Sequence, residues 1–264
     1  MRAISSRQNP AVRAFRELAR TPDPTGARLL LDGVHLIRNA MAAGTALEAI
    51  AVSASRAAAR DEADIVRAAA AHGTPVFTVA TQAFAAMSPV RAPSGVVAIA
   101  HRTPVDAHSI CRRPDGFVLI AADIQDPGNL GSLIRAGEAG GVSGVLVCGA
   151  SASPFSWKAV RGSMGSILRL PVAAGLAVDA AMRCIRAQNG RVVAAVPRQG
   201  RDPDAVNWRG RVALLVGGEG PGLSEATLGQ VDDAVTIPMS SPVESLNVAV
   251  AAAILVYAAR RQRT

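Results

Sequence analysis

Short runs of apolar residues alternate with amphipathic stretches over the first hundred residues of the chain. A run of about four to eight apolar residues is typical of a buried strand, whereas apolar residues three or four positions apart are typical of a helix that packs on one face. The alternation predicts a small α/β domain over residues 1–105. Its predicted strands are residues 28–31, 47–53, 75–79 and 95–100, and its predicted helices are residues 34–43 and 60–71.

The chain turns polar between His101 and Asp115, where prolines interrupt any periodicity. We therefore expect a linker at residues 106–115 and a second domain at residues 116–264. The apolar runs of this second domain are apolar on both faces, which is typical of strands buried in a parallel sheet. An α/β fold with a parallel sheet is therefore predicted here. Its predicted strands are residues 117–121, 145–148, 168–172, 192–196, 212–216 and 235–237.

The excess of basic over acidic residues in the first domain is concentrated in the segment before Leu29. Residues 10–20 predict an amphipathic helix with Val12, Phe15 and Leu18 facing inward. The segment is a candidate RNA contact, although a solvated helix face explains its charge equally well. Its basic residues are Arg2, Arg7, Arg13, Arg16, Arg20 and Arg28, set against Glu17 and Asp23.

The net charge of +8 and the sequence pI near 11.0 favour a polyanionic partner, either nucleic acid or anionic lipid. Lys158 is the only lysine, and arginine pairs bidentately with phosphate, although genome base composition also explains such a bias. Three scattered cysteines argue against a disulfide framework or a thiolate metal site, so we expect no metal. Residues 248–259, the longest apolar stretch, fall short of the roughly 20 residues of a membrane span. The expected location is the cytoplasm, away from membranes.

Three segments of the second domain carry candidate chemistry. The first, residues 123–137, follows a predicted strand and runs into a helix, which is where open α/β sheets bind ligands. Pro127 and Gly128 predict a turn, Asn129 is a good N-cap, and Arg135 is expected about two helical turns later on the same general side of the helix. The plainer alternative is that Asn129 only caps the helix and that Arg135 only pairs with a surface acid.

The second segment, residues 212–224, is a predicted strand that leads into a glycine-rich loop at Gly217 and Gly218. Glycines let the backbone approach a ligand closely. The loop is neither a dinucleotide fingerprint, because Leu223 stands at the third glycine position, nor a P-loop. Glu219 is a candidate site residue, with a solvated loop carboxylate as the alternative.

The third segment, residues 237–248, places small polar residues before an apolar helix. Such a helix is typical of a buried element whose N-terminus points at a site. Ser241 with Glu244 fits a capping box, so these two residues have a purely structural alternative role.

Together the three segments resemble the signature motifs of the SpoU (TrmH-like) family of SPOUT RNA 2′-O-ribose methyltransferases. The resemblance rests on residues 129–135, 217–220, 237–239 and 245–247, in that order, and covers residues 117–262. Residues 31–37 and 94–98 look more loosely like the substrate-binding domain that many family members carry. An added domain of this kind favours ribosomal RNA over transfer RNA as the substrate, by analogy.

The resemblance implies a trefoil-knotted catalytic domain, a homodimer and S-adenosylmethionine as the cofactor. The knot is an exception to ordinary chain topology. Cofactor binding is implied for Gly217, Gly218, Ile237, Met239 and Leu246. The transfer site is implied to contain Arg135, Asn129, Glu219, Ser245 and Asn247, some of them supplied by the second subunit.

The implied reaction is attack of a ribose 2′-hydroxyl on the methyl group. The four histidines are His35, His72, His101 and His108, and all of them precede the expected catalytic domain. Base catalysis by histidine is therefore not expected. The family's candidate base is Arg135, but a guanidinium group stays protonated in proteins, which makes it a poor proton acceptor. We favour a role in which Arg135 binds a phosphate and stabilises the alkoxide while water takes the proton. Both roles stay open at this point.

Two other functions compete with this interpretation. A non-catalytic RNA-binding or ribosome-assembly protein would keep the knot without the activity, and the intact Arg135, Asn129 and Asn247 count against it. A nucleotide-dependent oxidoreductase would need the missing glycine fingerprint and an acidic residue about twenty positions later. A transfer RNA methyltransferase remains the alternative within the family.

Overall fold

The computed structural model describes residues 2–88, 90, 93–218, 220 and 222–263, and the chain forms two compact units. Unit 1 contains residues Met1–Pro104 together with Phe155–Arg169. Unit 2 contains Val105–Pro154 and Leu170–Thr264. The sequence patterns did not indicate that residues 155–169 leave the second unit and join the first.

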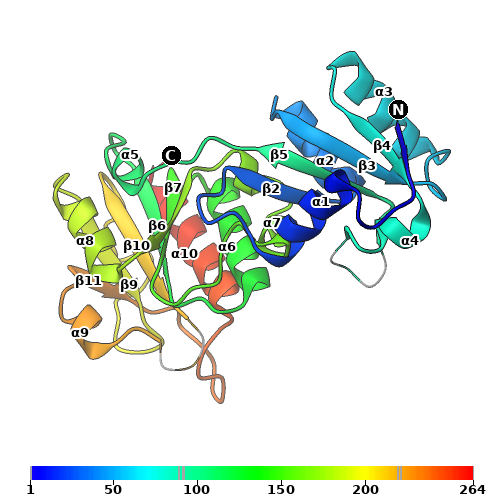
Figure 1. The fold of residues 1–264 in the computed structure, drawn as a ribbon. Coiled ribbons are helices and arrows are strands. Elements are labelled where there is room, and N and C mark those ends of the chain that lie inside the picture. Colours follow the sequence, from blue (N-terminus) through cyan, green and yellow to red (C-terminus); the bar gives the residue numbers. More distant parts are fainter. Residues whose placement is uncertain (1, 89, 91–92, 219, 221, 264) are drawn as a thin grey trace. The chain divides into compact units, whose positions relative to one another are not determined.

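Unit 1 is built on a mixed sheet with the strand order β1-β4-β3-β5-β2 (Figure 1). Strands β1, β4 and β3 pair in parallel, whereas β5 runs antiparallel to both β3 and β2. The strands of unit 1 are β1 (Arg2–Ile4), β2 (Arg28–Asp32), β3 (Leu47–Ser53), β4 (Val76–Val79) and β5 (Val96–His101). The helices of unit 1 are α1 (Pro10–Arg20), α2 (Val34–Ala42), α3 (Arg60–Ala71), α4 (Thr81–Phe84), α7 (Trp157–Gly162) and the 3-10 helix η1 (Ser166–Leu168).

Helix α1 confirms the amphipathic pattern of residues 10–20. Its Val12, Phe15 and Leu18 are buried in a cluster with strand residues of the sheet. Asn9 begins the helix, because its side chain accepts a hydrogen bond from the backbone of Ala11. The predicted strands and helices of residues 28–100 are also present, whereas the short edge strand β1 was not predicted.

Unit 2 contains a six-stranded parallel sheet with the order β11-β9-β10-β6-β7-β8. The prediction of a parallel sheet is therefore confirmed. The strands of unit 2 are β6 (Phe117–Ala122), β7 (Gly144–Cys148), β8 (Val172–Leu176), β9 (Arg191–Ala195), β10 (Val212–Gly217) and β11 (Asp233–Val235). The helices of unit 2 are α5 (Ala107–Cys111), α6 (Pro127–Gly140), α8 (Val178–Arg186), α9 (Glu225–Leu228) and α10 (Val248–Arg263).

Three local predictions for this part of the chain are wrong. The strand expected at residues 168–172 is the end of η1 followed by β8, which starts only at Val172. The segment expected to be a linker contains α5, which Asp106 caps by accepting a hydrogen bond from the backbone of Ser109. The last strand ends at Val235, so Ile237 lies beyond the sheet.

Helices cover both faces of the parallel sheet (Figure 1). Helices α5 and α8 pack on one face, where Ile110, Met182 and Ile185 join the apolar cluster of the strands. Helices α6 and α10 pack on each other at Gly140, where an added methyl group would lie 2.0 Å from a side-chain carbon of Val256. Glycine is therefore required at this helix crossing.

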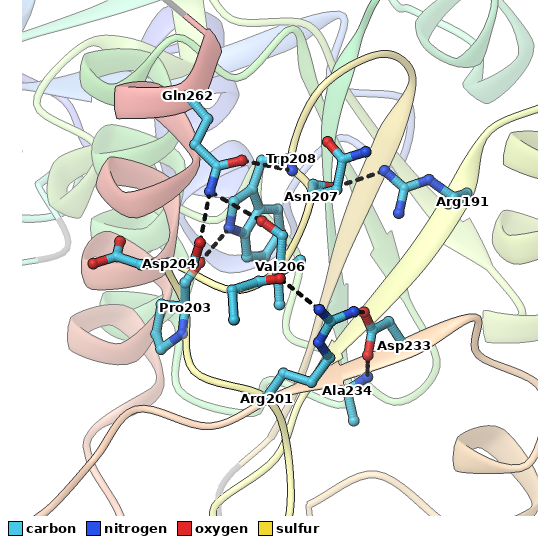
Figure 2. Close-up of polar contacts among 11 residues, drawn as sticks. Arg191, Arg201, Pro203, Asp204, Val206, Asn207, Trp208, Asp233, Ala234 and Gln262 are labelled. Atoms are coloured by element: carbon cyan, nitrogen blue, oxygen red, sulfur yellow. Dashed lines mark hydrogen bonds and ion pairs between the residues drawn. The ribbon is translucent and has the colours of Figure 1, made fainter.

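The connection between β9 and β10 is tied to the last turn of α10 (Figure 2). Gln262 accepts a hydrogen bond from the backbone of Trp208 and donates to the carbonyl oxygens of Asp204 and Val206. The indole of Trp208 is fully buried and donates to the carbonyl of Pro203 at 2.8 Å. The C-terminal helix thus orders a connection that lies more than fifty residues earlier in the chain.

The two buried cysteines of unit 2, Cys111 and Cys148, are not suited to thiol chemistry. Burial raises the pKa of Cys111, with a further contribution from the neighbouring Cys184 thiol. Burial and the nearby charge of Asp123 raise the pKa of Cys148 to about 12. A thiol is the nucleophile only as its thiolate, so both buried cysteines stay protonated and inert near neutral pH. No helix in the described part of the chain combines the length and the apolar character needed to cross a membrane.

Candidate functional site

The candidate site lies at the carboxyl edge of the parallel sheet. Gly217, at the end of β10, pairs with Ala122 at the end of β6, and Ala122 pairs with Cys148 at the end of β7. The loops that follow these three strands therefore start side by side. This is the edge at which open α/β sheets bind ligands.

Asp123, which directly follows β6, holds two of these loops together. Its backbone is left-handed, with φ of 56°, and its carboxylate accepts a hydrogen bond from the backbone of Ala150 at 2.7 Å. Ser151 completes the junction, because its hydroxyl donates to the carbonyl of Cys148 and accepts from the backbone of Ile124. The sequence analysis missed the roles of Asp123 and Ser151, although an acidic residue immediately after a buried strand was a visible signal.

The glycine loop after β10 packs directly against the same junction. A methyl group added at Gly218 would lie 2.0 Å from the carbonyl oxygen of Asp123, and one added at Gly217 would lie 2.9 Å from the backbone nitrogen of Leu223. Neither position has room for a side chain, so both glycines are needed for this close approach. Glu219, predicted as a site residue, lies outside the described residues.

The first helix of the site begins differently from the prediction. The N-cap of α6 is Asp126, whose side chain accepts a hydrogen bond from the backbone of Asn129 at 2.7 Å, and Pro127 is the first helical residue. The interpretation of Asn129 as the N-cap is therefore wrong. The side chain of Asn129 is left to make other contacts.

The third segment also begins its helix differently from the prediction. Asn247 caps α10, because its side-chain oxygen accepts hydrogen bonds from the backbone of Ala249 at 2.9 Å and Val250 at 3.3 Å. The proposed capping box of Ser241 and Glu244 is therefore wrong, since both residues precede the helix. Glu244 instead lies 3.7 Å from Arg198 as an exposed ion pair.

The structure joins the first and third segments through their two asparagines. The side-chain amide of Asn247 donates a hydrogen bond to the side-chain oxygen of Asn129 at 3.0 Å. The two residues are 118 positions apart in the chain. The same amide that caps α10 thus links it to the first turn of α6.

Arg135 is exposed and lies further along α6. Six helical residues separate it from Asn129, which corresponds to about 9 Å along the axis and roughly 120° around it. The interpretation that the two residues share one side of the helix is therefore wrong. Within one subunit, the structure brings Asn129 and Asn247 together and leaves Arg135 apart from them.

The remaining predicted residues lie in the chain segment that connects β11 to α10. Ile237, Met239 and Leu246 are partly buried, and Ser245 is exposed. Among the described ranges, no group of three or more His, Cys, Asp or Glu side chains is placed to hold a metal ion.

One histidine belongs to unit 2 after all. His108 lies in α5, which the sequence analysis placed in the linker. The neighbouring Ile110 packs against Gly144 at the start of β7. His108 therefore lies near the amino edge of the sheet, at the opposite end from the loops of the candidate site, and no base role follows from it.

Substitutions at the asparagine pair should separate its two functions. Asn247→Ala removes the cap of α10, at a cost of about 1 kcal/mol in the free energy of unfolding, and also the bond to Asn129. Asn247→Ser keeps a capping oxygen, but its shorter side chain carries no amide to reach Asn129. We expect near-wild-type stability in urea unfolding for Asn247→Ser, with the methyl transfer that the resemblance implies reduced as far as in Asn129→Ala. Full activity of Asn247→Ser would show that the bond has no role beyond capping.

Comparison with known proteins identifies both parts of the chain. Residues 116–257 match the SpoU rRNA Methylase family, and residues 9–98 match the MRM3-like substrate binding domain. The 23S rRNA (guanosine(2553)-2'-O)-methyltransferase RlmP of Bacillus subtilis is 36% identical over 140 residues, which cover 53% of this chain and 56% of that protein. The chain thus spans little more than half the length of the curated relatives it matches.

Two solved structures resemble the whole chain. The SpoU methyltransferase AviRb from Streptomyces viridochromogenes, in complex with AdoMet, has a TM-score of 0.85 at 26% identity and covers 97% of this chain and 98% of its own. The AdoMet-bound rRNA methyltransferase from Sinorhizobium meliloti has a TM-score of 0.83 at 26% identity, with 98% and 97% covered. With more than half of its residues matched to one family, the chain belongs to the SpoU rRNA Methylase family.

Proposed function

We propose that the protein transfers a methyl group from S-adenosylmethionine to a ribose 2′-hydroxyl of ribosomal RNA. The observation that carries the proposal is that the three candidate segments, residues 123–137, 212–224 and 237–248, meet at one edge of the sheet. Gly218 packs on Asp123, and Asn247 bonds Asn129, so residues from all three motifs meet there. The name of the Bacillus subtilis relative supports ribosomal RNA and the 2′-hydroxyl as the target.

The loops fit the proposed cofactor. Close packing at Gly217 and Gly218 leaves backbone groups, rather than side chains, at the end of β10. Ile237, Met239 and Leu246 add partly buried apolar surface of the kind that packs against an adenine ring. When bound, S-adenosylmethionine supplies an electrophilic methyl group on a sulfonium sulfur.

Positioning by the chain's own residues supplies much of the rate in such a transfer. Asn129 and Asn247 hold each other in place, and together with Ser245 and Glu219 they orient the ribose. Arg135 binds the adjacent phosphate and stabilises the developing alkoxide, while water accepts the proton. Because Arg135 lies apart from the asparagine pair within one subunit, we place it at the site of a second subunit.

The proposed assembly is a homodimer of knotted domains. Val250, Ile254 and Tyr257 are spaced four and three residues apart on α10 and are 48%, 41% and 46% exposed. An exposed apolar stripe of this kind is typical of a protein interface. Since α10 packs on α6, a dimer along this stripe supports the placement of Arg135 near the partner's site. The trefoil knot is proposed because the chain belongs to the family. The cytoplasm is proposed as the location of the protein because its proposed substrate is ribosomal RNA.

The function is tested by transfer of labelled methyl groups from S-adenosylmethionine to purified RNA. Ribosomal RNA from a strain that lacks the gene is the substrate, and RNA from the parent strain, already modified, is the matched control. Incorporation only into the unmodified ribosomal RNA, mapped to a 2′-O-methylated nucleotide, supports the proposal. Incorporation into transfer RNA instead would favour the alternative substrate. Binding of RNA without incorporation into either substrate would indicate a non-catalytic RNA-binding protein.

A further inference from the structure

Residues 155–169 complete unit 1 from within the sequence of the methyltransferase domain. Strand β2 is the outer strand of the mixed sheet, and α7 packs along it (Figure 1). The chain enters unit 1 after Pro154 and leaves it before Leu170. An outer strand presents unpaired backbone groups, which such a covering helix protects.

Contacts at both ends fix this segment within unit 1. At its start, the ring of Phe155 packs so closely on Gly26 that an added methyl group would lie 2.4 Å from it. Trp157 packs against the apolar cluster that contains the buried face of α1. At its other end, the side chain of Asn39 in α2 donates a hydrogen bond to the carbonyl of Met164 at 3.0 Å. Helices α1 and α7 therefore both pack on strand β2 within one folded unit.

Both helices present positive charge to solvent. Residues 151–178 contain no acidic residue, and Lys158 and Arg161 of α7 are exposed. On α1, Arg13, Arg16 and Arg20 are three, four and seven residues apart, so they lie on one side of the helix. Within the described part of the chain, Arg13 forms an exposed ion pair with Glu17, whereas the other four pair with no carboxylate.

Trp157 connects α7 to the apolar cluster that contains the buried face of α1. Its ring packs toward the α1 cluster, and the ammonium group of Lys158 lies 5.7 Å from its centroid. This contact holds the Lys158 side chain on the side of α7 that bears Trp157. Arg161, three residues after Lys158, lies on the same side of α7. The cations of the two helices therefore border one surface.

We propose that α1 and α7 together form a binding surface for the RNA sugar-phosphate backbone, with α7 as its second half. We call this the α1–α7 surface, made of Arg13, Arg16, Arg20, Lys158 and Arg161. The proposal rests on the RNA substrate proposed above and names where unit 1 holds it. Its proposed ligand is the chain of RNA phosphates, because the surface consists of several cations. Contacts to phosphates position the RNA and do not require a pocket that recognises bases.

The test removes the charge of α7 alone. The double variant Lys158→Gln with Arg161→Gln is compared with a control double variant, Arg60→Gln with Arg67→Gln. The control residues lie on α3, a helix whose buried Ile65 is not part of the apolar cluster that contains α1. Both variants lose two charges from exposed positions of unit 1. Binding to unmodified ribosomal RNA fragments is measured by fluorescence anisotropy from 50 to 300 mM KCl, about the range over which counterion release dominates.

We expect the α7 variant to bind RNA on the order of 10-fold more weakly at 150 mM salt. Its plot of log K against log salt should flatten by about 1.4 to 1.8, which corresponds to two lost phosphate contacts. The α3 variant should keep the wild-type slope. The affinity for S-adenosylmethionine and the melting temperature should be unchanged in both variants. A similar flattening is expected for Arg13→Gln with Arg20→Gln, because α1 forms the other half of the surface.

Equal slopes for the wild type, the α7 variant and the α3 variant would overturn the proposal. Loss of binding to phosphatidylglycerol vesicles in the α7 variant, with an unchanged RNA slope, would overturn it in favour of a lipid surface. Methyl transfer by the wild-type protein is measured in parallel. Transfer to ribosomal RNA with an unchanged slope in the α7 variant refutes the α1–α7 surface and leaves the proposed function intact. A wild type that neither binds nor methylates any RNA refutes both.

Discussion

Arg135→Ala should lower methyl transfer on the order of 10²- to 10³-fold, the usual cost of removing one donor that stabilises a developing charge. Arg135 is exposed on α6, so its removal leaves no buried cavity or unpaired group in the fold. The affinity for S-adenosylmethionine and the melting temperature should therefore stay close to the wild type. Single-turnover transfer of labelled methyl groups to RNA isolates the chemical step from product release.

Arg135→Lys distinguishes two forms of this role. If Arg135 supplies only positive charge, lysine should retain appreciable activity. If Arg135 pairs bidentately with a phosphate through two of its guanidinium nitrogens, lysine should be almost as inactive as alanine, because an ammonium group is a point charge. Arg183→Ala is a matched control on α8, on the other face of the sheet, and should be fully active. Wild-type transfer rates in Arg135→Ala would remove Arg135 from the site.

Gly218→Ala should weaken binding of S-adenosylmethionine by about one to two orders of magnitude. The new methyl group would lie 2.0 Å from the carbonyl oxygen of Asp123, and both are backbone-anchored, so the glycine loop must move. Overpacking of this kind costs about 1–3 kcal/mol, which corresponds to roughly 5- to 150-fold in affinity. Isothermal titration calorimetry with S-adenosylmethionine measures the change in affinity. Thermal unfolding shows whether the substitution also lowers the stability of unit 2.

Gly229→Ala is the matched control for this substitution. Gly229 ends α9 with a helical backbone, and an added methyl group would lie 3.4 Å from the nearest atom, the carbonyl oxygen of Glu225. The same change in mass and composition should therefore leave cofactor affinity unchanged. Unaltered affinity in Gly218→Ala would mean that the loop after β10 does not hold the cofactor in the described conformation.

The regular elements were predictable because their pattern is local. The strands at residues 117–122 and 212–217 are apolar throughout, and helix α1 repeats its apolar residues every three positions. The three loops could be assigned to one edge because the carboxyl ends of parallel strands meet there. Residue patterns alone were enough for these conclusions.

The contacts within the site could not be predicted in the same way. Which residue caps a helix depends on where the backbone turns helical, and the sequence offered Asn129 for α6 where the structure uses Asp126. The bond between Asn129 and Asn247 joins residues 118 positions apart, and no local pattern encodes it. The transfer of residues 155–169 to unit 1 depends on the contacts of Phe155 and Trp157 with distant residues.

This transfer also limits which fragments can be used, because a fragment that begins near Arg112 would carry Phe155 and Trp157 without their partners in unit 1. It would expose apolar surface that the full chain buries, and such surface promotes association. Full-length variants are therefore the better test of which unit binds the cofactor.

The insertion of residues 155–169 into unit 1 also sets the order of events on the ribosome. The strands of the mixed sheet have all been synthesised by His101, yet the edge of β2 is not covered until α7 has been made. At about 5–20 residues per second, the nascent chain carries that open edge for several seconds. During this interval β6 and β7 of unit 2 are also made, before β10 and β8, the strands that flank them in the sheet. Translation speed between residues 104 and 169 should therefore influence the yield of folded protein more than translation speed elsewhere in the chain.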